Sequence, residues 1–264
     1  MRFSQVVSLE ELQKILVEAG ELLREFSVGS LTKSYKDGGS FATEADIASE
    51  KFLIERLQKL LPDSGIWAEE SGKNLKDENG YYWVIDPVDG TNNFAQGIPF
   101  SCISVALVSQ QEIIIGIIYD FHRDEMFVAS RGNGAYMNGQ PIHVSSKAIL
   151  QEAIISSPIA YRGQVSSKDR GAFWKALEEV DKECCSIRVL GSAALSLAYV
   201  ACGRLDVALF DRLSWWDVAA GTLLIQEAGG IVTTFTGGPI DHSFKTLIGG
   251  PKALYDQLFV IISK

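Results

Sequence analysis

The sequence lacks several features that would point to particular classes of protein. Its four cysteines form no Cys-x-x-Cys pair, which argues against a zinc knuckle or a thioredoxin-type redox site. Only three histidines are present, without the spacing of a metal-binding pair. Neither Gly-x-x-x-x-Gly-Lys-Ser/Thr nor Gly-x-Ser-x-Gly occurs, so the sequence indicates neither a P-loop kinase nor a serine hydrolase. We expect the thiols to be reduced and mostly buried.

Positive charge is also scarce. Lys and Arg total 24 against 33 Asp and Glu, which gives a formal net charge of −9. Such an acidic chain has no general electrostatic attraction for nucleic acid or anionic membranes, so we expect neither as a partner. An anionic substrate would need a local reversal of the field. Divalent cations held by carboxylates would provide that reversal.

Long hydrophobic runs and linker-like segments are absent as well. No run approaches the length of a membrane span, and Met1 to Gln5 lack the apolar core of a signal peptide, so we expect a soluble, cytoplasmic protein. Hydrophobic residues make up 47% of the 264 residues, which is ordinary for a globular enzyme. We place a soft boundary near Val144, between an N-terminal α+β half (residues 1–144) and a C-terminal α/β half (residues 145–264), packed tightly enough to count as one domain.

Hydrophobic periodicity predicts two helices near the N-terminus. Ser8-Leu-Glu-Glu11 is a capping-box pattern that opens an amphipathic helix ending near Phe26. Thr43 caps a second helix that ends near Leu61. Between them, the polar, glycine-rich segment 34–40 predicts a mobile surface loop.

The rest of the chain predicts a strand meander followed by alternating strands and helices. Strands are expected at 66–68, 81–85, 102–109, 112–120 and 125–130, with a hairpin turn at Asn138-Gly139. Further strands are expected near 153–157, 186–190, 206–210 and 231–235, and helices near 166–180, 192–202 and 217–228. This order predicts stacked sheets and helices.

An acidic motif follows the second of these strands. Asp86 ends the apolar run, and Pro87 is expected to break the strand ladder and turn the chain. Gly90 permits a tight bend after Asp89, and Thr91 can begin a helix whose free N–H groups face an anion. Two carboxylates beside backbone donors suit a pair of magnesium and phosphate. The same residues are also typical of a simple turn, which is the commoner meaning of so short a motif.

Other acidic residues strengthen the functional interpretation when they are taken together. Glu69 and Glu70 follow another apolar strand, Asp46 lies three residues after Thr43, and Asp217 opens an apolar helix. Each has an ordinary alternative. The glutamates are typical of a solvated edge, and the two aspartates are typical of helix caps.

At this point the sequence resembles the inositol monophosphatase-like sugar phosphatases. The blocks that carry the resemblance occur in the family's order over nearly the whole chain. They are Thr43-Glu-Ala-Asp46, Trp67-Ala-Glu-Glu-Ser71, Asp86-Pro-Val-Asp-Gly-Thr-Asn-Asn-Phe94, Gly97-Ile-Pro-Phe100, Gly191-Ser-Ala-Ala-Leu195, Gly203-Arg-Leu-Asp206, Trp216-Asp-Val-Ala-Ala-Gly221 and Glu227-Ala-Gly-Gly230.

The resemblance implies a fold and a set of ligands. The fold is a layered α-β-α-β-α sandwich of the α+β class, commonly a lithium-sensitive homodimer with two or three Mg²⁺ ions. Carried over by position, the first metal is held by Glu69, Asp86 and the carbonyl of Val88, the second by Asp86, Asp89 and Asp217, and a third by Glu70 through water. Gly90 and Thr91 supply amides to the phosphate, and the substrate contacts are Asp89, Gly191, Ser192, Ala193, Asp211, Arg212 and Asp217.

The implied reaction is hydrolysis of a small phosphorylated polyol or sugar without a phosphoenzyme. A metal-activated water, oriented by Glu69 and by a Thr91–Asp46 pair, attacks phosphorus directly. We expect inositol 1-phosphate as the substrate. Fructose 1,6-bisphosphate, histidinol phosphate and 3′-phosphoadenosine 5′-phosphate stay open, because relatives use them, and so does a catalytically idle binding or regulatory role.

One departure from the family's pattern concerns the substrate. Members that cleave inositol phosphate usually place an acidic residue seven positions before the Asp of Trp-Asp, and Phe210 occupies that offset here. A one-residue deletion would let Asp211 take over the contact. Arg212 could then pair with Asp211, bind a second anionic group of a larger substrate, or simply face solvent. Lys36, at a place where the family often carries Lys, is either a residue that closes over the site or an ordinary exposed one.

Overall fold

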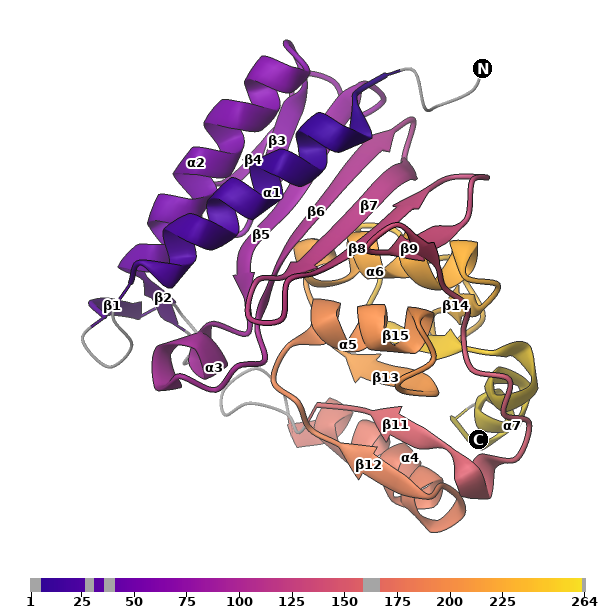
Figure 1. Ribbon diagram of the computed structural model, residues 1–264. Coiled ribbons are helices and arrows are strands. Elements are labelled where there is room, and N and C mark those ends of the chain that lie inside the picture. Colours follow the sequence, from indigo (N-terminus) through magenta and orange to yellow (C-terminus); the bar gives the residue numbers. More distant parts are fainter. Residues whose placement is uncertain (1–5, 27–30, 36–40, 159–166, 263–264) are drawn as a thin grey trace.

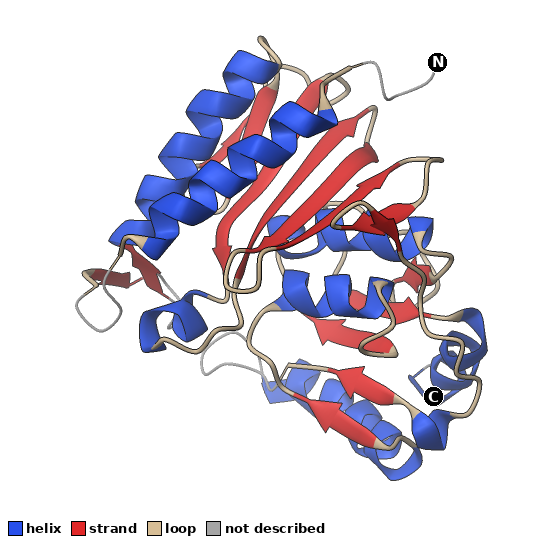
Figure 2. Ribbon diagram, viewed as in Figure 1, coloured by secondary structure: helices blue, strands red, loops and turns tan. Residues whose placement is uncertain are grey.

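The computed structural model describes residues 6–26, 31–35, 41–158 and 167–262, and it stacks helices and sheets in alternating layers (Figure 1). The helices that form layers are α1 (Leu9–Arg24), α2 (Glu44–Leu60), α4 (Ser167–Glu183), α5 (Ala193–Ala201), α6 (Trp215–Glu227) and α7 (Lys252–Ile262). α1 and α2 cover one face of an eight-stranded sheet, and α5 and α6 lie between it and a five-stranded sheet. α4 and α7 cover the far face of the second sheet (Figure 2). The α-β-α-β-α order is confirmed.

The larger sheet has the strand order β10-β9-β8-β7-β6-β5-β3-β4. Its strands are β3 (Gly65–Ala68), β4 (Gly72–Asn74), β5 (Tyr81–Asp89), β6 (Cys102–Ser109), β7 (Glu112–Asp120), β8 (Glu125–Ser130), β9 (Ala135–Met137) and β10 (Gln140–Pro141). The predicted meander is present as β6, β7 and β8, and only β3 and β5 pair in parallel among these strands. The predicted hairpin turn joins β9 to β10, with positive φ angles at Asn138 and Gly139 (47° and 76°).

The smaller sheet has the order β12-β11-β13-β15-β14. Its strands are β11 (Ile154–Ser156), β12 (Ser186–Arg188), β13 (Val207–Asp211), β14 (Ile231–Thr233) and β15 (Thr246–Gly250). The remaining short elements are β1 (Lys33–Tyr35), β2 (Phe41–Thr43), α3 (Thr91–Gln96) and the 3-10 turn η2 (Leu150–Glu152). The sequence did not predict β4, β15 or α7.

Two local predictions are corrected. The segment expected as a loop from residue 34 begins instead as strand β1, which pairs antiparallel with β2, and residues 36–40 lie outside the described part of the chain. All four cysteines are free as expected, but only Cys102 is buried, so the expectation of mostly buried thiols is wrong. Within the described residues, no helix combines the length and apolarity needed to cross a membrane.

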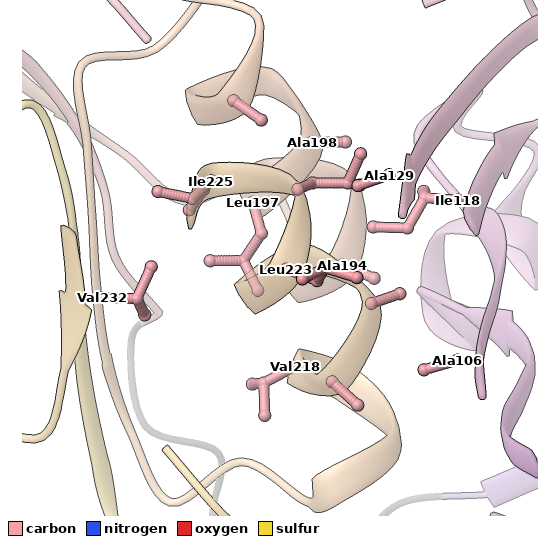
Figure 3. Close-up of a cluster of buried hydrophobic side chains, with 14 of the residues drawn as sticks. Ala106, Ile118, Ala129, Ala194, Leu197, Ala198, Val218, Leu223, Ile225 and Val232 are labelled. Atoms are coloured by element: carbon pink, nitrogen blue, oxygen red, sulfur yellow. The ribbon is translucent and has the colours of Figure 1, made fainter. Parts of the chain in front are cut away.

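The hydrophobic core lies on both faces of each sheet. One cluster fills the space between α1, α2 and the larger sheet, and another joins α4 and α7 to the smaller sheet. The largest lies between the sheets, where side chains of α5 and α6 such as Leu197, Val218 and Leu223 belong to one cluster with residues of the larger sheet such as Ile118 and Ala129 (Figure 3). Because the central strands are covered on both sides, they read as nearly continuous hydrophobic runs rather than alternating ones. The boundary proposed at Val144 lies between β10 and β11.

Candidate active site

The acidic motif lies at the end of β5. Pro87 interrupts the regular pairing, as predicted, but the expected turn does not follow at once, because β5 continues to Asp89 with a bulge. Asp86 pairs with Ser104 and Asp89 with Cys102, so Pro87 and Val88 together face a single residue of β6. The bulge places both carboxyl groups at the same edge. Gly90 then adopts a left-handed conformation (φ 92°) as the N-cap of α3, as the turn chemistry predicts.

Asp217 joins this pair from the other half of the chain. It occupies the first turn of α6, where its Oδ2 accepts a hydrogen bond from the Ser214 N–H at 2.6 Å within a capping box. Ligand atoms of Asp86, Asp89 and Asp217 all lie within 4.8 Å of one another. The capping role foreseen as the ordinary alternative is therefore real, but the same carboxylate also belongs to the cluster.

Burial and mutual repulsion make this cluster electrostatically unfavourable without a cation. Burial raises the pKa of Asp86 well above its ordinary value, and the negative charges of Glu69 and Asp89 raise it further. Burial likewise raises the pKa of Asp217, with contributions from Asp89 and Glu69. The pKa of Asp89 rises to about 6 through burial, although hydrogen bonds from Ser192 and Ala194 oppose the change.

Asp89 is fixed by the C-terminal half of the chain. Its Oδ2 accepts hydrogen bonds from the Ser192 hydroxyl and from the Ala194 N–H, the latter at 2.7 Å. The Cys102 thiol lies 3.9 Å from the same oxygen. Ser192 is also the N-cap of α5, where its Oγ accepts from the Leu195 N–H at 3.3 Å. The side chain of Ser192 therefore orients a carboxylate of the cluster.

Asp46 and Thr91 meet, as the resemblance implied. The Thr91 hydroxyl lies 2.8 Å from Asp46 Oδ1 and 3.1 Å from the carbonyl oxygen of Val88. Asp46 Oδ2 accepts from the N–H of Thr43 at 2.8 Å and from its hydroxyl, which completes the predicted capping box of α2. Burial raises the pKa of Asp46, while the hydrogen bonds from Thr43 and Thr91 lower it.

The two glutamates after β3 occupy different places. Glu69 lines the same cavity as Asp86 and Asp89, whereas Glu70 is not among the described residues that line it. The Glu69 N–H donates to the carbonyl oxygen of Ile85 at 3.1 Å, which ties the turn after β3 to β5.

The acidic cluster opens into a cavity of about 480 Å³, a size typical of small-molecule sites. Residues from both halves of the chain form its walls. The predicted residues on them are Glu69, Asp86, Val88, Asp89, Gly90, Thr91, Gly191, Ser192, Ala193, Asp211, Arg212 and Asp217. Arg212 Nε lies 3.4 Å from Asp211 Oδ2, so these two residues form an ion pair at the rim. Lys36 lies outside the described residues.

Sequence reasoning missed two residues that hold the site together. The Asn93 side chain donates to the carbonyl oxygens of Phe100 (2.8 Å) and Leu190 (2.7 Å), which joins α3 to the loop before α5. Glu50 accepts hydrogen bonds from the N–H groups of Glu70 and Ser71. The only sequence signal for Glu50 was its spacing from Asp46, one helical turn away on the same face of α2.

The donor set fits a hard divalent cation. It offers three carboxylates from two chain segments, β5 and α6, and a cation would relieve the repulsion that raises their pKa values. Asp86, Asp89 and Asp217 are the residues that would hold it, with Glu69 at the same cavity wall.

Comparisons with known proteins agree with this geometry. The profile described as the inositol monophosphatase family matches residues 6–263. The inositol-1-monophosphatase of Mesorhizobium japonicum is 36% identical over 258 residues, which cover 97% of this chain and 96% of that protein. The fructose-1,6-bisphosphatase/inositol-1-monophosphatase of Thermotoga maritima is 33% identical, with 95% and 94% covered. The crystal structure of extragenic suppressor protein suhB from Bartonella henselae superposes with a TM-score of 0.90 at 35% identity, over 97% of this chain and 98% of that one.

Proposed function

Because this chain belongs to the inositol monophosphatase family, we propose that it hydrolyses inositol 1-phosphate in a Mg²⁺-dependent reaction. The family and its relatives make the chain a phosphomonoesterase that acts on phosphorylated polyols. The particular ester, the identity of the metal and the number of ions, two or three, belong to the proposal.

One observation carries the proposal. Three carboxylates whose ligand atoms lie within 4.8 Å of one another line a cavity together with Gly90, Thr91 and Asp211. The cavity therefore combines three kinds of group. The carboxylates can bind a cation, the backbone N–H groups at the start of α3 can bind a phosphate, and Asp211 can accept hydrogen bonds from substrate hydroxyls.

Mg²⁺, when bound, supplies charge neutralisation for the phosphate and acidifies water. The chain's own residues would bind and orient the reactants. Thr91 donates its hydroxyl proton towards Asp46 and Val88, so the lone pairs of its oxygen stay available to accept a hydrogen bond from the attacking water. Asp46 holds the Thr91 hydroxyl in this orientation. We propose that Glu69, at the cavity wall, orients the same water.

On the substrate side, we propose that Asp211 accepts hydrogen bonds from the polyol hydroxyls. It ends β13 on the wall of the cavity, where it forms an ion pair with Arg212. Contacts from the backbone of Gly191, Ser192 and Ala193 are part of the same proposal. The Ser192 hydroxyl donates its hydrogen bond to Asp89. The polar groups that residues 191–193 present to a ligand are therefore those of the main chain.

Fructose 1,6-bisphosphate is the second candidate, favoured by Arg212. This residue also lines a neighbouring cavity of about 740 Å³, together with Lys245. The Arg212 N–H donates to the carbonyl oxygen of Lys245 at 2.7 Å, so the two cationic residues lie on adjoining segments. A second phosphate on the substrate would suit that pair.

Phosphate release from four esters tests these alternatives. Inositol 1-phosphate, fructose 1,6-bisphosphate, histidinol phosphate and 3′-phosphoadenosine 5′-phosphate are compared with Mg²⁺ and with EDTA, and the Asp89→Asn protein serves as the control for contaminating phosphatases. We expect kcat/KM for inositol 1-phosphate to be at least about tenfold above the others. Equal turnover of fructose 1,6-bisphosphate, lowered selectively by Arg212→Ala, would favour the second candidate. Phosphate release at the same rate in EDTA as in Mg²⁺ would contradict the proposal.

The remaining expectations from the sequence and from the resemblance stay predictions. A homodimer is checked by light scattering of the purified protein, lithium sensitivity by adding Li⁺ to the phosphate assay, and a cytoplasmic location by cell fractionation.

A further inference from the structure

One face of α2 carries buried polar side chains where a core helix would carry apolar ones. Asp46, Ser49 and Glu50 are 0%, 0% and 4% exposed and recur at the i, i+3, i+4 spacing of one helix face. Each contacts a different segment of the site. Asp46 accepts from Thr91, and the Ser49 hydroxyl lies 3.2 Å from the Pro87 carbonyl oxygen in the β5 bulge. Glu50 reaches the turn after β3.

Glu50 closes that turn with two hydrogen bonds. Ala68 of β3 pairs with Gly72 of β4, so residues 69–71 form the connecting turn. Glu50 Oε2 accepts from the Glu70 N–H at 2.7 Å, and Oε1 accepts from the Ser71 N–H at 2.8 Å. The carboxylate thus occupies both of its oxygens with consecutive N–H groups of one turn.

The same turn carries Glu69 on the wall of the cavity. On one side, the Glu69 N–H is bound to Ile85 of β5 at 3.1 Å. On the other side, the next two N–H groups are bound to Glu50. The backbone around Glu69 is therefore held from both directions, which restricts where its carboxylate can point.

We propose that Glu50 is a positioning residue that fixes the Glu69 turn and thereby sets the affinity of the site for Mg²⁺. Bonds from a carboxylate to N–H groups are among the stronger hydrogen bonds, and their loss leaves partly buried N–H groups without acceptors. Outer partners of metal ligands typically change metal affinity or activity about 10–100-fold when they are removed. This role rests on the proposed Mg²⁺-dependent function.

Isothermal titration with Mg²⁺ tests the role without any substrate. The full-length protein is compared with Glu50→Gln and with Glu55→Gln, a matched control on the exposed side of the same helix. Gln has nearly the shape of Glu, but its NH₂ group cannot accept a hydrogen bond. We expect Kd for Mg²⁺ to rise about 10–100-fold in Glu50→Gln and to stay unchanged in Glu55→Gln. We also expect kcat to recover partly as Mg²⁺ is raised, with KM for the ester little changed.

Several outcomes would overturn the proposal. Wild-type affinity for Mg²⁺ in Glu50→Gln would show that Glu50 does not position the ligand turn. A loss of turnover that no Mg²⁺ concentration relieves would do the same. If Glu50→Gln does not fold, judged by circular dichroism, Glu50→Asp decides: it keeps the charge but is too short to hold both N–H groups, so its Kd must still rise. A wild-type protein that binds no Mg²⁺ would remove the proposed function itself, and this role with it.

Discussion

At the scale of single residues, the site is defined by carboxylates that are costly to bury. Asp86 and Asp89 are 1% and 8% exposed, and their pKa values are raised because burial and like charges disfavour ionisation. Such perturbed carboxyl groups in a cavity are typical of functional sites rather than of purely structural ones. Hydrogen bonds from Ser192 and Ala194 fix Oδ2 of Asp89, and hydrogen bonds from Thr43 and Thr91 engage both oxygens of Asp46.

Asp89→Asn should separate catalysis from folding. We expect the metal-free variant to be at least as stable as the wild type, because one repelling charge is removed from a buried cluster. Turnover should fall by about 10²–10³-fold or more, since the cation loses a charged ligand. Steady-state phosphate release and thermal melting are the two measurements. Ordinary turnover in a pure preparation would rule out the assignment of Asp89 as a metal ligand.

Ser192→Ala should have a smaller, two-part effect. The change removes a hydrogen bond to Asp89 Oδ2 and the N-cap of α5 at once. Loss of the cap is expected to cost about 1 kcal/mol of unfolding free energy. Because the Asp89 carboxylate is then held less firmly, Mg²⁺ affinity or activity should fall by about 10-fold. Ser192→Thr, which keeps a hydroxyl, is the matched variant. If both variants lost activity equally, the hydroxyl would not be the cause.

At the scale of elements, the site depends on how closely α6 approaches the larger sheet. Gly116 of β7 faces the backbone of α6. A Cβ there would lie 2.7 Å from the carbonyl oxygen of Ala220 and 3.0 Å from its Cα. The first turn of the same helix holds Asp217, so the contact between β7 and α6 also sets the distance between Asp217 and the carboxylates of β5.

Gly116→Ala is therefore expected to destabilise the protein and to impair the site. Overpacking against a backbone that cannot move aside should cost about 1–3 kcal/mol, visible as a fall in melting temperature of several degrees. Mg²⁺ affinity should fall too, because α6 must shift. Gly171→Ala is the control: nothing lies within 4 Å of its Cβ position in α4, so stability should stay equal or rise by up to about 1 kcal/mol. A neutral Gly116→Ala would mean that the helix and the sheet are not tightly coupled.

At the scale of the whole molecule, the clustered carboxylates link stability to pH and to the metal. Without Mg²⁺, the folded chain keeps protons on Asp86, Asp89 and Asp217 that the unfolded chain has already released above about pH 4. The unfolded state then binds fewer protons, so the free energy of unfolding decreases as pH rises through this window. Asp46, whose pKa is also raised, acts in the same direction.

The expected result is a metal-free protein that melts at a lower temperature at pH 7.5 than at pH 5. For Asp89 alone, a pKa of about 6 corresponds to a loss on the order of 3 kcal/mol over the whole window from below pH 4 to above pH 6, of which about 1.4 kcal/mol falls between pH 5 and pH 7.5. Saturating Mg²⁺ at pH 7.5 should restore about 3 kcal/mol at a hundred times its Kd. Melting curves in EDTA and in Mg²⁺ across this range provide the check, with Asp89→Asn as the variant that should flatten the pH dependence. A metal-free protein that gains stability towards pH 7.5 would contradict it.

The sequence by itself determined much of the local structure and singled out the carboxylates of the candidate cation site. Capping residues at Ser8 and Thr43, the hydrophobic runs of the meander and the Asn138-Gly139 turn each act over a few residues, so their structures follow from local physics. The bulge at Pro87 did not follow from such rules. A proline at the end of an apolar run can either stop the strand or be accommodated in a bulge, and the local sequence does not decide between the two. β15 and α7 were missed altogether.

Local sequence patterns did not determine which polar groups meet, whereas the tertiary structure did. Asp217 reaches Asp86 and Asp89 because α6 packs between the two sheets, and Ser192 reaches Asp89 because α5 lies beside it. In the sequence, Glu50 does not differ from any other helical glutamate. Only the folded structure shows that its buried carboxylate accepts a hydrogen bond from the Ser71 N–H. A local pattern states which side of an element is buried but not what lies opposite. The partners of buried polar side chains are therefore fixed by the packing of distant segments.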